Sequence, residues 1–260
     1  MAAQHGLTAD GWRLMALITL LTDFGTADSY VGEVKGVLAS AAPRAVVVDV
    51  THDVTPADIR GAQYVLNRTW RRFPPGSVHL VVVDPGVGTA RRALAAAADE
   101  HFFVAPDNGL LSCIAATARF VSLPVPADAA PTFHARDVFA IAAARLATGT
   151  PLGQLGSAIT DPYHSPLPTP RLDGVALVGE VIYVDRFGTL VTNIPGAQVE
   201  PGVRIRVDTV DVGPLRRTYG DVERGQLVAY VGSNGEVEIA AREGSAVRLL
   251  GVGVGAVVRA

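Results

Sequence analysis

The sequence predicts an α/β N-terminal domain, Rossmann-like, with a mostly parallel sheet and flanking helices, followed by a smaller all-β, barrel-like domain. Up to about Gly149, short apolar runs alternate with segments of helical spacing, which is typical of parallel α/β sheets. Beyond the proline-rich segment Asp161–Pro170, short runs break often at glycine and no helical segments separate them, which favours a compact barrel. We therefore expect domains at residues 14–165 and 172–260.

The individual elements follow from the same patterns. In the N-terminal half, strands are expected at 15–21, 45–50, 79–83, 101–105 and 120–123, and helices at 30–40, 58–70, 110–118 and 136–148. Gly149 after the last helix suits a helix C-terminus. In the C-terminal half, strands are expected at 174–185, 203–212, 227–231, 237–241 and 246–250, with the Gly-Val repeat at 251–255 as a final strand.

Composition excludes several classes of function. The chain has 260 residues, 49% hydrophobic and 18% charged, and this length provides an ample core for one or two domains. A formal net charge of −3 without a concentrated basic face argues against nucleic-acid binding. No apolar stretch is long enough to span a membrane, and the first residues do not resemble a signal peptide. We expect a cytoplasmic protein that does not contact membranes.

The single cysteine, Cys113, can form neither an intramolecular disulfide nor a thiolate metal site, and its apolar neighbours favour a packing role. The six histidines lack the spacing of metal ligands, so we expect no metal. A Gly-x-x-x-x-Gly-Lys phosphate loop does not occur. Gly86-Val-Gly88 begins like a dinucleotide-binding fingerprint, but Arg91 stands where the third glycine would be, which argues against a nicotinamide cofactor.

Three aspartates, Asp23, Asp49 and Asp84, stand at the ends of predicted buried strands. Ligands bind at the carboxyl ends of the strands in open α/β sheets, and a carboxylate there can accept hydrogen bonds from both hydroxyls of a ribose. The alternative is that an aspartate only caps the next helix, which we expect for one of the three. Asp84 also opens a glycine-rich loop that leads to Arg91.

Another candidate segment is Phe133–Asp137, in which His134 and two opposite charges open a predicted helix. The alternative is an exposed helix start capped by Thr132. His134 becomes functional only if the fold brings a partner to it.

Seven segments, in order, carry a resemblance that covers nearly the whole chain: Thr22–Thr26, Asp49–His52, Val83–Arg91, Ala105–Leu111, Thr132–Asp137, Asp185–Ile194 and Gly232–Gly235. Together they resemble the SAM hydroxide adenosyltransferase family, which is related to the SAM-dependent fluorinases and chlorinases. Two positions depart from its pattern: Thr189 stands where asparagine is frequent, and Ala135 where glycine is usual.

The resemblance implies an enzyme that cleaves S-adenosyl-L-methionine (SAM) with water to adenosine and L-methionine, with SAM as substrate and no cofactor. It implies that Asp84, Arg91 and His134 position the attacking water or hydroxide. The substrate-binding positions that it implies are Asp23 for the ribose and, for the remainder of the substrate, Asp185, Phe187, Asn193, Ser233 and Asn234. It also implies a homotrimer with the active site at the subunit interface.

Two alternatives remain open from the sequence. One is a SAM-dependent halogenase that forms a 5′-halo-5′-deoxyadenosine, although the Asp84 carboxylate would repel a halide ion. The segment Asp99–Phe103 also lacks the extra loop typical of halogenases. The other alternative is a non-catalytic SAM- or adenosine-binding protein.

Overall fold

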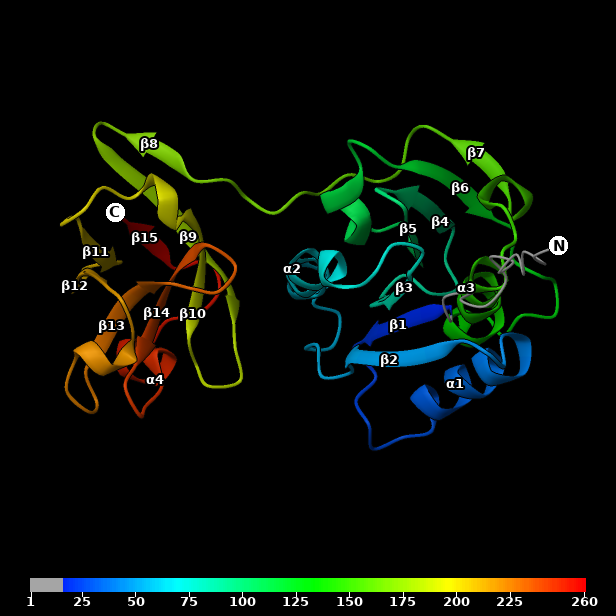
Figure 1. Cartoon of the computed structure of the whole chain (residues 1–260), viewed down its shortest axis with the longest axis horizontal. Helices are drawn as coiled ribbons and strands as arrows, with labels where there is room; N and C mark the ends of the chain where they lie inside the picture. The colour runs from blue at the N-terminus through cyan, green and yellow to red at the C-terminus, as the bar shows by residue number, and fades with distance from the viewer. Residues whose placement is uncertain (1–15) are drawn as a thin grey trace, which may run out of the picture. The chain divides into compact units, whose positions relative to one another are not determined.

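The computed structural model describes residues 16–260 (Figure 1). Residues 14 and 15 of the first predicted domain lie outside this range, and residue 15, Met15, was also expected to begin the first strand. The chain forms two compact units. The first contains residues 16–62 and 69–164, and the second contains Gln63–Arg68 and Ser165–Ala260. Residues 161–170, the proline-rich segment, form neither helix nor strand.

The first unit is built on a seven-stranded sheet in the order β2-β1-β3-β5-β4-β6-β7. Its strands are β1 (Leu17–Thr22), β2 (Val46–Thr51), β3 (Val78–Val82), β4 (Ala93–Ala98), β5 (His101–Pro106), β6 (Arg119–Leu123) and β7 (Ser157–Ile159). Strands β2, β1, β3 and β5 run parallel, whereas β4, β6 and β7 pair antiparallel. The α/β class predicted from the sequence is confirmed.

Helices α1 (Tyr30–Ala41) and α3 (Ala140–Ala147) accompany this sheet, whereas residues 63–68 of α2 (Ile59–Thr69) belong to the second unit. Helix α3 packs on β1, β3 and β5, and α1 packs against α3. The side of α3 that faces the core is mostly alanine, which lets the helix approach the sheet closely. A π-helical turn, Ala135–Phe139, precedes α3 and forms the start of the helix expected at 136–148.

One expected helix of this unit was wrong, and the strands β4 and β7 were not expected. The helix expected at 110–118 is a short 3₁₀ turn, Leu110–Ile114, entered through Gly109 at φ +97°. Strand β4 was not expected, because apart from Leu94 it is alanine, which has little strand preference. Pairing with both β5 and β6 keeps it extended, so its neighbours decide its conformation.

The second unit is a closed seven-stranded barrel, formed by β10-β14-β13-β12-β11-β15-β9, with β8 added beside β9. The pairing of β9 with β10 closes the barrel. Its strands are β8 (Arg171–Asp173), β9 (Ala176–Val184), β10 (Leu190–Pro195), β11 (Arg204–Val207), β12 (Val210–Arg216), β13 (Leu227–Val231), β14 (Glu236–Ala241) and β15 (Val257–Arg259). The barrel-like prediction is confirmed.

The end of the chain differs from expectation. Residues 246–250 form helix α4 (Ala246–Leu250) instead of a strand, because Ser245 caps its N-terminus and Gly251, at φ +67°, ends it. The Gly-Val repeat is not a strand either, and the last strand, β15, begins only at Val257. Between residues 16 and 260, no helix is long and apolar enough to cross a membrane.

A buried histidine pair lies between β3 and β5. His79 Nδ1 hydrogen-bonds Thr19 Oγ1 at 2.8 Å, and His79 Nε2 lies 3.1 Å from His101 Nδ1. Burial, and the repulsion expected from His101, lower the pKa of His79 from 6.5 to about 3. The Trp70 ring packs edge-on against both imidazoles. His79 therefore stays neutral in the folded protein at any physiological pH.

This depressed pKa predicts a pH-dependent stability. Below pH 6.5 His79 is protonated in the unfolded chain but stays neutral in the folded protein. The free energy of unfolding therefore falls by about 1.4 kcal/mol per pH unit towards pH 3. We expect His79→Gln to be less stable at neutral pH but to show a shallower slope in urea unfolding between pH 7.5 and 5. The matched control, His164→Gln at an exposed position, should keep the slope of the original protein. An unchanged slope in His79→Gln would contradict this account.

Candidate active site

The first unit contains a cavity of about 640 Å³ at the carboxyl ends of β1 and β3. Asp23 follows β1 and Asp84 follows β3, and both side chains line the cavity. These strands are parallel neighbours with Thr22 paired to Val82, which brings the two aspartates to the same edge of the sheet. The volume lies within the range of small-molecule sites.

Arg91 joins Asp84 to His134. Its Nε donates to Asp84 Oδ1 at 2.9 Å and its Nη2 donates to Asp84 Oδ2, forming a two-pronged ion pair. The Arg91 Nη2 atom also lies 3.1 Å from His134 Nδ1. The side chains of Arg91 and Asp84 are only 9% and 6% exposed, so water screens their attraction little. The loop Asp84–Arg91 and the segment that contains His134 therefore join three polar side chains into one cluster.

The glycine-rich loop allows this approach. At Gly88 the backbone has φ +77°, and a Cβ there would lie 2.7 Å from the carbonyl oxygen of Pro131. The loop that carries Arg91 thus packs directly against the segment that leads to His134. Turns within the loop are held by the Thr89 hydroxyl, which donates to the Gly86 carbonyl at 2.7 Å. Gly88 therefore serves close packing of the two segments.

The hydrogen bond from Arg91 determines how His134 is protonated. A guanidinium can only donate, so Nδ1 of His134 must accept, and the hydrogen of the neutral ring lies on Nε2. Burial and the positive charge of Arg91 lower the pKa of His134, which favours this neutral form. His134, expected to be exposed in the alternative interpretation, is buried and lines the cavity.

Arg91 retains one unused donor. Its Nη1 atom is buried and has no hydrogen-bond partner among residues 16–260. The guanidinium carbon also lies 5.2 Å from the centroid of the Phe139 ring, a cation–π contact that helps to hold it in place. A buried donor of this kind can stabilise a water, hydroxide or anionic oxygen beside Asp84.

Asp23 and Asp49 have different surroundings, although both end predicted strands. Asp23 Oδ2 accepts from the Ala57 amide at 2.9 Å, and the side chain lines the cavity. Asp49 lies within β2 and binds Lys35 Nζ at 2.6 Å, with His52 Nε2 3.1 Å away. Burial raises the pKa of Asp49, but the hydrogen bonds from Lys35 and His52 outweigh it, so the pKa is lowered. Asp49 is therefore paired with Lys35 and is not among the residues that line the cavity.

Aromatic side chains of the cavity were not identified from the sequence. The ring centroids of Tyr30 and Phe133 lie 5.4 Å apart, and Phe24 lies 6.0 Å from Tyr30. For Phe24 and Phe133 the available signal is a candidate polar residue directly beside them, Asp23 and His134, whereas Tyr30 has no such neighbour. Flat rings next to a carboxylate suit a ligand that has both apolar and hydroxyl groups.

The second unit places Asp185, Phe187, Ser233 and Asn234 at two turns, and Asn193 within β10. At the β9–β10 turn, Asp185 Oδ1 accepts from the amides of Phe187 at 2.9 Å and Thr189 at 2.8 Å. Asp185 and Phe187 line a hollow of about 540 Å³ together with Ser245. The Phe187 side chain is 77% exposed, so it is free to contact a ligand.

Asn193 has a structural environment. Its Oδ1 accepts from the Glu180 amide at 2.8 Å, and its Nδ2 donates to the Pro168 carbonyl at 3.0 Å. Both ends of the side-chain amide therefore hold backbone, which suggests that Asn193 shapes the barrel at this point. Its expected contact with substrate stays a prediction.

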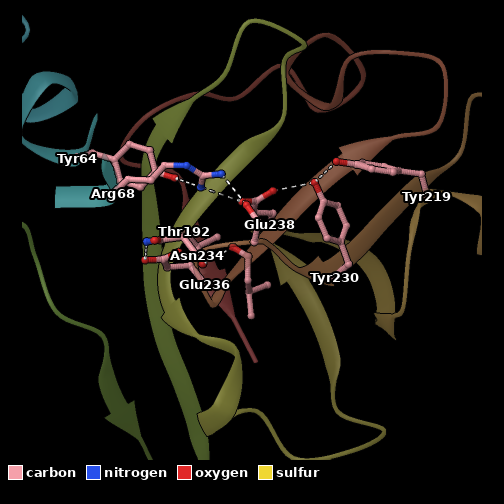
Figure 2. Close-up of polar contacts among 10 residues, drawn as sticks. Tyr64, Arg68, Thr192, Tyr219, Tyr230, Asn234, Glu236 and Glu238 are labelled. Atoms are coloured by element: carbon pink, nitrogen blue, oxygen red, sulfur yellow. Dashed lines mark hydrogen bonds and ion pairs between the residues drawn. The ribbon is translucent and has the colours of Figure 1, made fainter. Parts of the chain in front are cut away.

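Ser233 and Asn234 lie in the β13–β14 turn, shown in Figure 2 with the polar groups around it. Arg68 Nη2 donates to Ser233 Oγ at 2.7 Å, and Asn234 Nδ2 donates to Glu236 Oε1 at 2.8 Å. The sequence did not single out Arg68, because it stands in a helix more than 160 positions before Ser233. The roles expected for Ser233 and Asn234 stay predictions.

Neither Cys113 nor a metal site adds a reactive group among residues 16–260. Burial raises the pKa of the Cys113 thiol to about 11, which makes it a poor nucleophile. Within the described range 16–260, no three histidine, cysteine or acidic side chains are placed to hold a metal ion.

The electrostatic account of His134 is testable by NMR. Arg91→Ala removes the positive charge and leaves the Asp84 carboxylate near the imidazole, so we expect the pKa of His134 to rise above its value in the unchanged protein. The control Arg145→Ala changes an exposed arginine of α3 and should leave that pKa unaltered. A His134 pKa that is equal in all three proteins would refute the charge contact.

Known proteins resemble the chain over almost its full length. A curated (R)-S-adenosyl-L-methionine hydrolase of Salinispora tropica is 43% identical over 246 residues, covering 90% of this chain and 94% of the relative. The hydrolase of the same name from Thermus thermophilus is 43% identical and covers 94% of this chain and 99% of the relative. A fluorinase of an Actinoplanes species is 31% identical, with coverage of 86% and 90%.

Solved structures and family profiles agree with these relatives. The crystal structure of an uncharacterised conserved protein from Thermotoga maritima matches with a TM-score of 0.86 at 35% identity, covering 93% of this chain and 98% of the other. The SAM hydroxide adenosyltransferase N-terminal domain profile matches residues 18–156, and the C-terminal domain profile matches residues 179–259. The chain therefore belongs to the SAM hydroxide adenosyltransferase family.

Proposed function

We propose that this protein hydrolyses SAM to adenosine and L-methionine by attack of water or hydroxide on C5′ of the ribose. The observation that carries the proposal is the Asp84–Arg91–His134 cluster beside a cavity also lined by Asp23. Family membership and relatives named as SAM hydrolases, at 43% identity, support it.

The chemistry needs alignment more than acid catalysis. The oxygen of water forms a bond to C5′ while the C5′–S bond breaks, and the sulfonium leaves as the neutral thioether of methionine. No proton has to reach the leaving group, and the only proton to remove is that of the water. Holding the nucleophile in line with the C5′–S bond can lower the barrier by roughly 7–11 kcal/mol.

The cluster offers a complementary set of contacts for such a water. The neutral His134 ring carries a donor at Nε2, and Arg91 has an unused buried donor at Nη1. Asp84 is the acceptor that can take a hydrogen bond from the water and then its proton. A water that donates to Asp84 and accepts from His134 or Arg91 would keep a lone pair for C5′, and the positive charge of Arg91 would favour hydroxide.

The substrate-binding roles remain part of this proposal. Asp23 would accept hydrogen bonds from the ribose hydroxyls. Asp185 would pair with the α-ammonium of the methionyl group, because its Oδ1 is held by the turn and its other oxygen remains for a ligand. Phe187, Asn193, Ser233 and Asn234 would complete the contacts to the substrate.

The resemblance also leads us to propose a homotrimer whose active site lies at the interface of neighbouring subunits. Analytical ultracentrifugation tests the assembly directly. A cytoplasmic location, a reaction that needs no cofactor, and the absence of membrane and nucleic-acid partners belong to the same proposal.

Product analysis tests the function. Chromatography of the protein incubated with SAM should show adenosine and methionine in equal amounts. We expect Asp84→Asn and His134→Ala to lower kcat by about 10²–10³, the loss typical of removing one group that positions or stabilises reacting atoms. The matched control His164→Gln should keep full activity. SAM that stays intact with the unchanged protein would overturn the proposal in favour of a binding protein.

Chloride and fluoride provide the second arm of that experiment. Some relatives are fluorinases, so a 5′-halo-5′-deoxyadenosine that appears only with added halide would favour a halogenase. We expect no such product, because the Asp84 carboxylate at the site repels a halide ion.

A further inference from the structure

Arg68 stands at the centre of a polar network in the second unit (Figure 2). Its Nη1 donates to the Tyr64 hydroxyl at 3.0 Å and lies 3.9 Å from Glu238 Oε1. Its Nη2 donates to Ser233 Oγ at 2.7 Å. The side chain is one-third exposed, whereas that of Glu238 is 11% exposed. One guanidinium thus contacts a phenol, a carboxylate and a serine hydroxyl at once.

The carboxylate of Glu238 is held from its other side as well. Tyr230 donates to Glu238 Oε2 at 2.8 Å, and the Tyr219 hydroxyl lies 2.8 Å from that of Tyr230. Burial raises the pKa of Tyr230, which keeps its hydroxyl protonated as a donor. A Cβ at Gly232 would collide with the Glu238 carboxylate, so the β13–β14 turn is built directly against it.

These contacts dictate the direction of the Ser233 hydroxyl. A serine oxygen can accept hydrogen bonds and donate one. Because Arg68 can only donate, it must use a lone pair of Ser233 Oγ, and the hydroxyl hydrogen is then left to point elsewhere. Ser233 is exposed, so that hydrogen is available to a ligand. A donor hydroxyl backed by a cation suits a carboxylate.

We propose that Arg68 is a positioning residue for substrate: by donating to Ser233 and neutralising Glu238, it turns the β13–β14 turn into a recognition site for the α-carboxylate of the methionyl group. This inference rests on the proposed function, which supplies the methionyl ligand. Without Arg68, the Ser233 hydroxyl would be free to turn towards Glu238, and the uncompensated carboxylate would repel the ligand.

Steady-state kinetics with two substrates provides the test. For Arg68→Gln we expect KM for SAM to rise roughly tenfold to a hundredfold, the range for losing a hydrogen bond to a charged group, with kcat nearly unchanged. For a SAM analogue without the α-carboxylate, kcat/KM should be the same in Arg68→Gln and in the unchanged protein. The matched control, Arg60→Gln, changes an exposed arginine of the same helix and should alter neither value.

A purely structural role for Arg68 gives a different result. The kcat/KM of Arg68→Gln would then fall by the same factor for both substrates, or would not fall for SAM. Either outcome overturns the inference. If the unchanged protein does not turn SAM over, the proposed function fails, and calorimetric affinity for L-methionine replaces KM. A weaker affinity in Arg68→Gln would still support the inference, whereas an equal affinity would overturn it.

Arg68→Lys covers the case in which Arg68→Gln does not fold. Lysine keeps the positive charge, but a single ammonium lacks the fork that reaches Tyr64, Ser233 and Glu238 together. We expect a higher KM for SAM in Arg68→Lys, and no further rise when Arg68→Lys is added to Ser233→Ala, since no hydroxyl is then left to orient. An equal rise in both backgrounds would contradict the inference.

Discussion

The ion pair between Arg91 and Asp84 is the interaction on which the candidate active site depends. Both side chains are nearly buried, so each charge requires the other, and the pair fixes the guanidinium relative to the sheet edge. From that position Arg91 donates to His134 and sets the tautomer of the imidazole. Gly88 lets the Arg91 loop pack against Pro131, which brings the His134 segment into range. Loop packing and the charge cluster therefore support one another.

The second unit repeats this physical arrangement with other residues. Arg68, compensated by Glu238, donates to the neutral acceptor Ser233, just as Arg91, compensated by Asp84, donates to His134. In each case the arginine donates a hydrogen bond to a lone pair of a neutral group, and that group keeps one hydrogen that it can donate to a ligand. Because the carboxylate balances the charge of the arginine, the group that donates a hydrogen bond to a ligand is the neutral hydroxyl or imidazole and not the guanidinium. Such donors are suited to recognising oxygen atoms of a water or a carboxylate.

Much of the architecture followed from local patterns. Apolar runs that alternate with helical segments predicted the α/β class, and the predicted strand ends indicated that Asp23, Asp49 and Asp84 would meet at one sheet edge. Asp23 and Asp84 do line one cavity there, whereas Asp49 lies within β2. Strand β4 was missed because alanine has no strong strand preference, and α4 was mistaken for a strand because its short apolar run fits both structures. In those segments the neighbouring strands and the caps decide the conformation, and their effect does not appear in periodicity.

The sequence alone determined the order of the motifs, the fold class and the identity of the groups that could do chemistry. Only the tertiary structure decided which of them act together. It separated Asp49, neutralised by Lys35, from Asp23 and Asp84, and it buried His134 against Arg91. It also joined Arg68 to Ser233, a contact across 165 positions of the chain. The physical reason is that hydrogen bonds and ion pairs depend on distance in space, whereas a sequence records only distance along the chain.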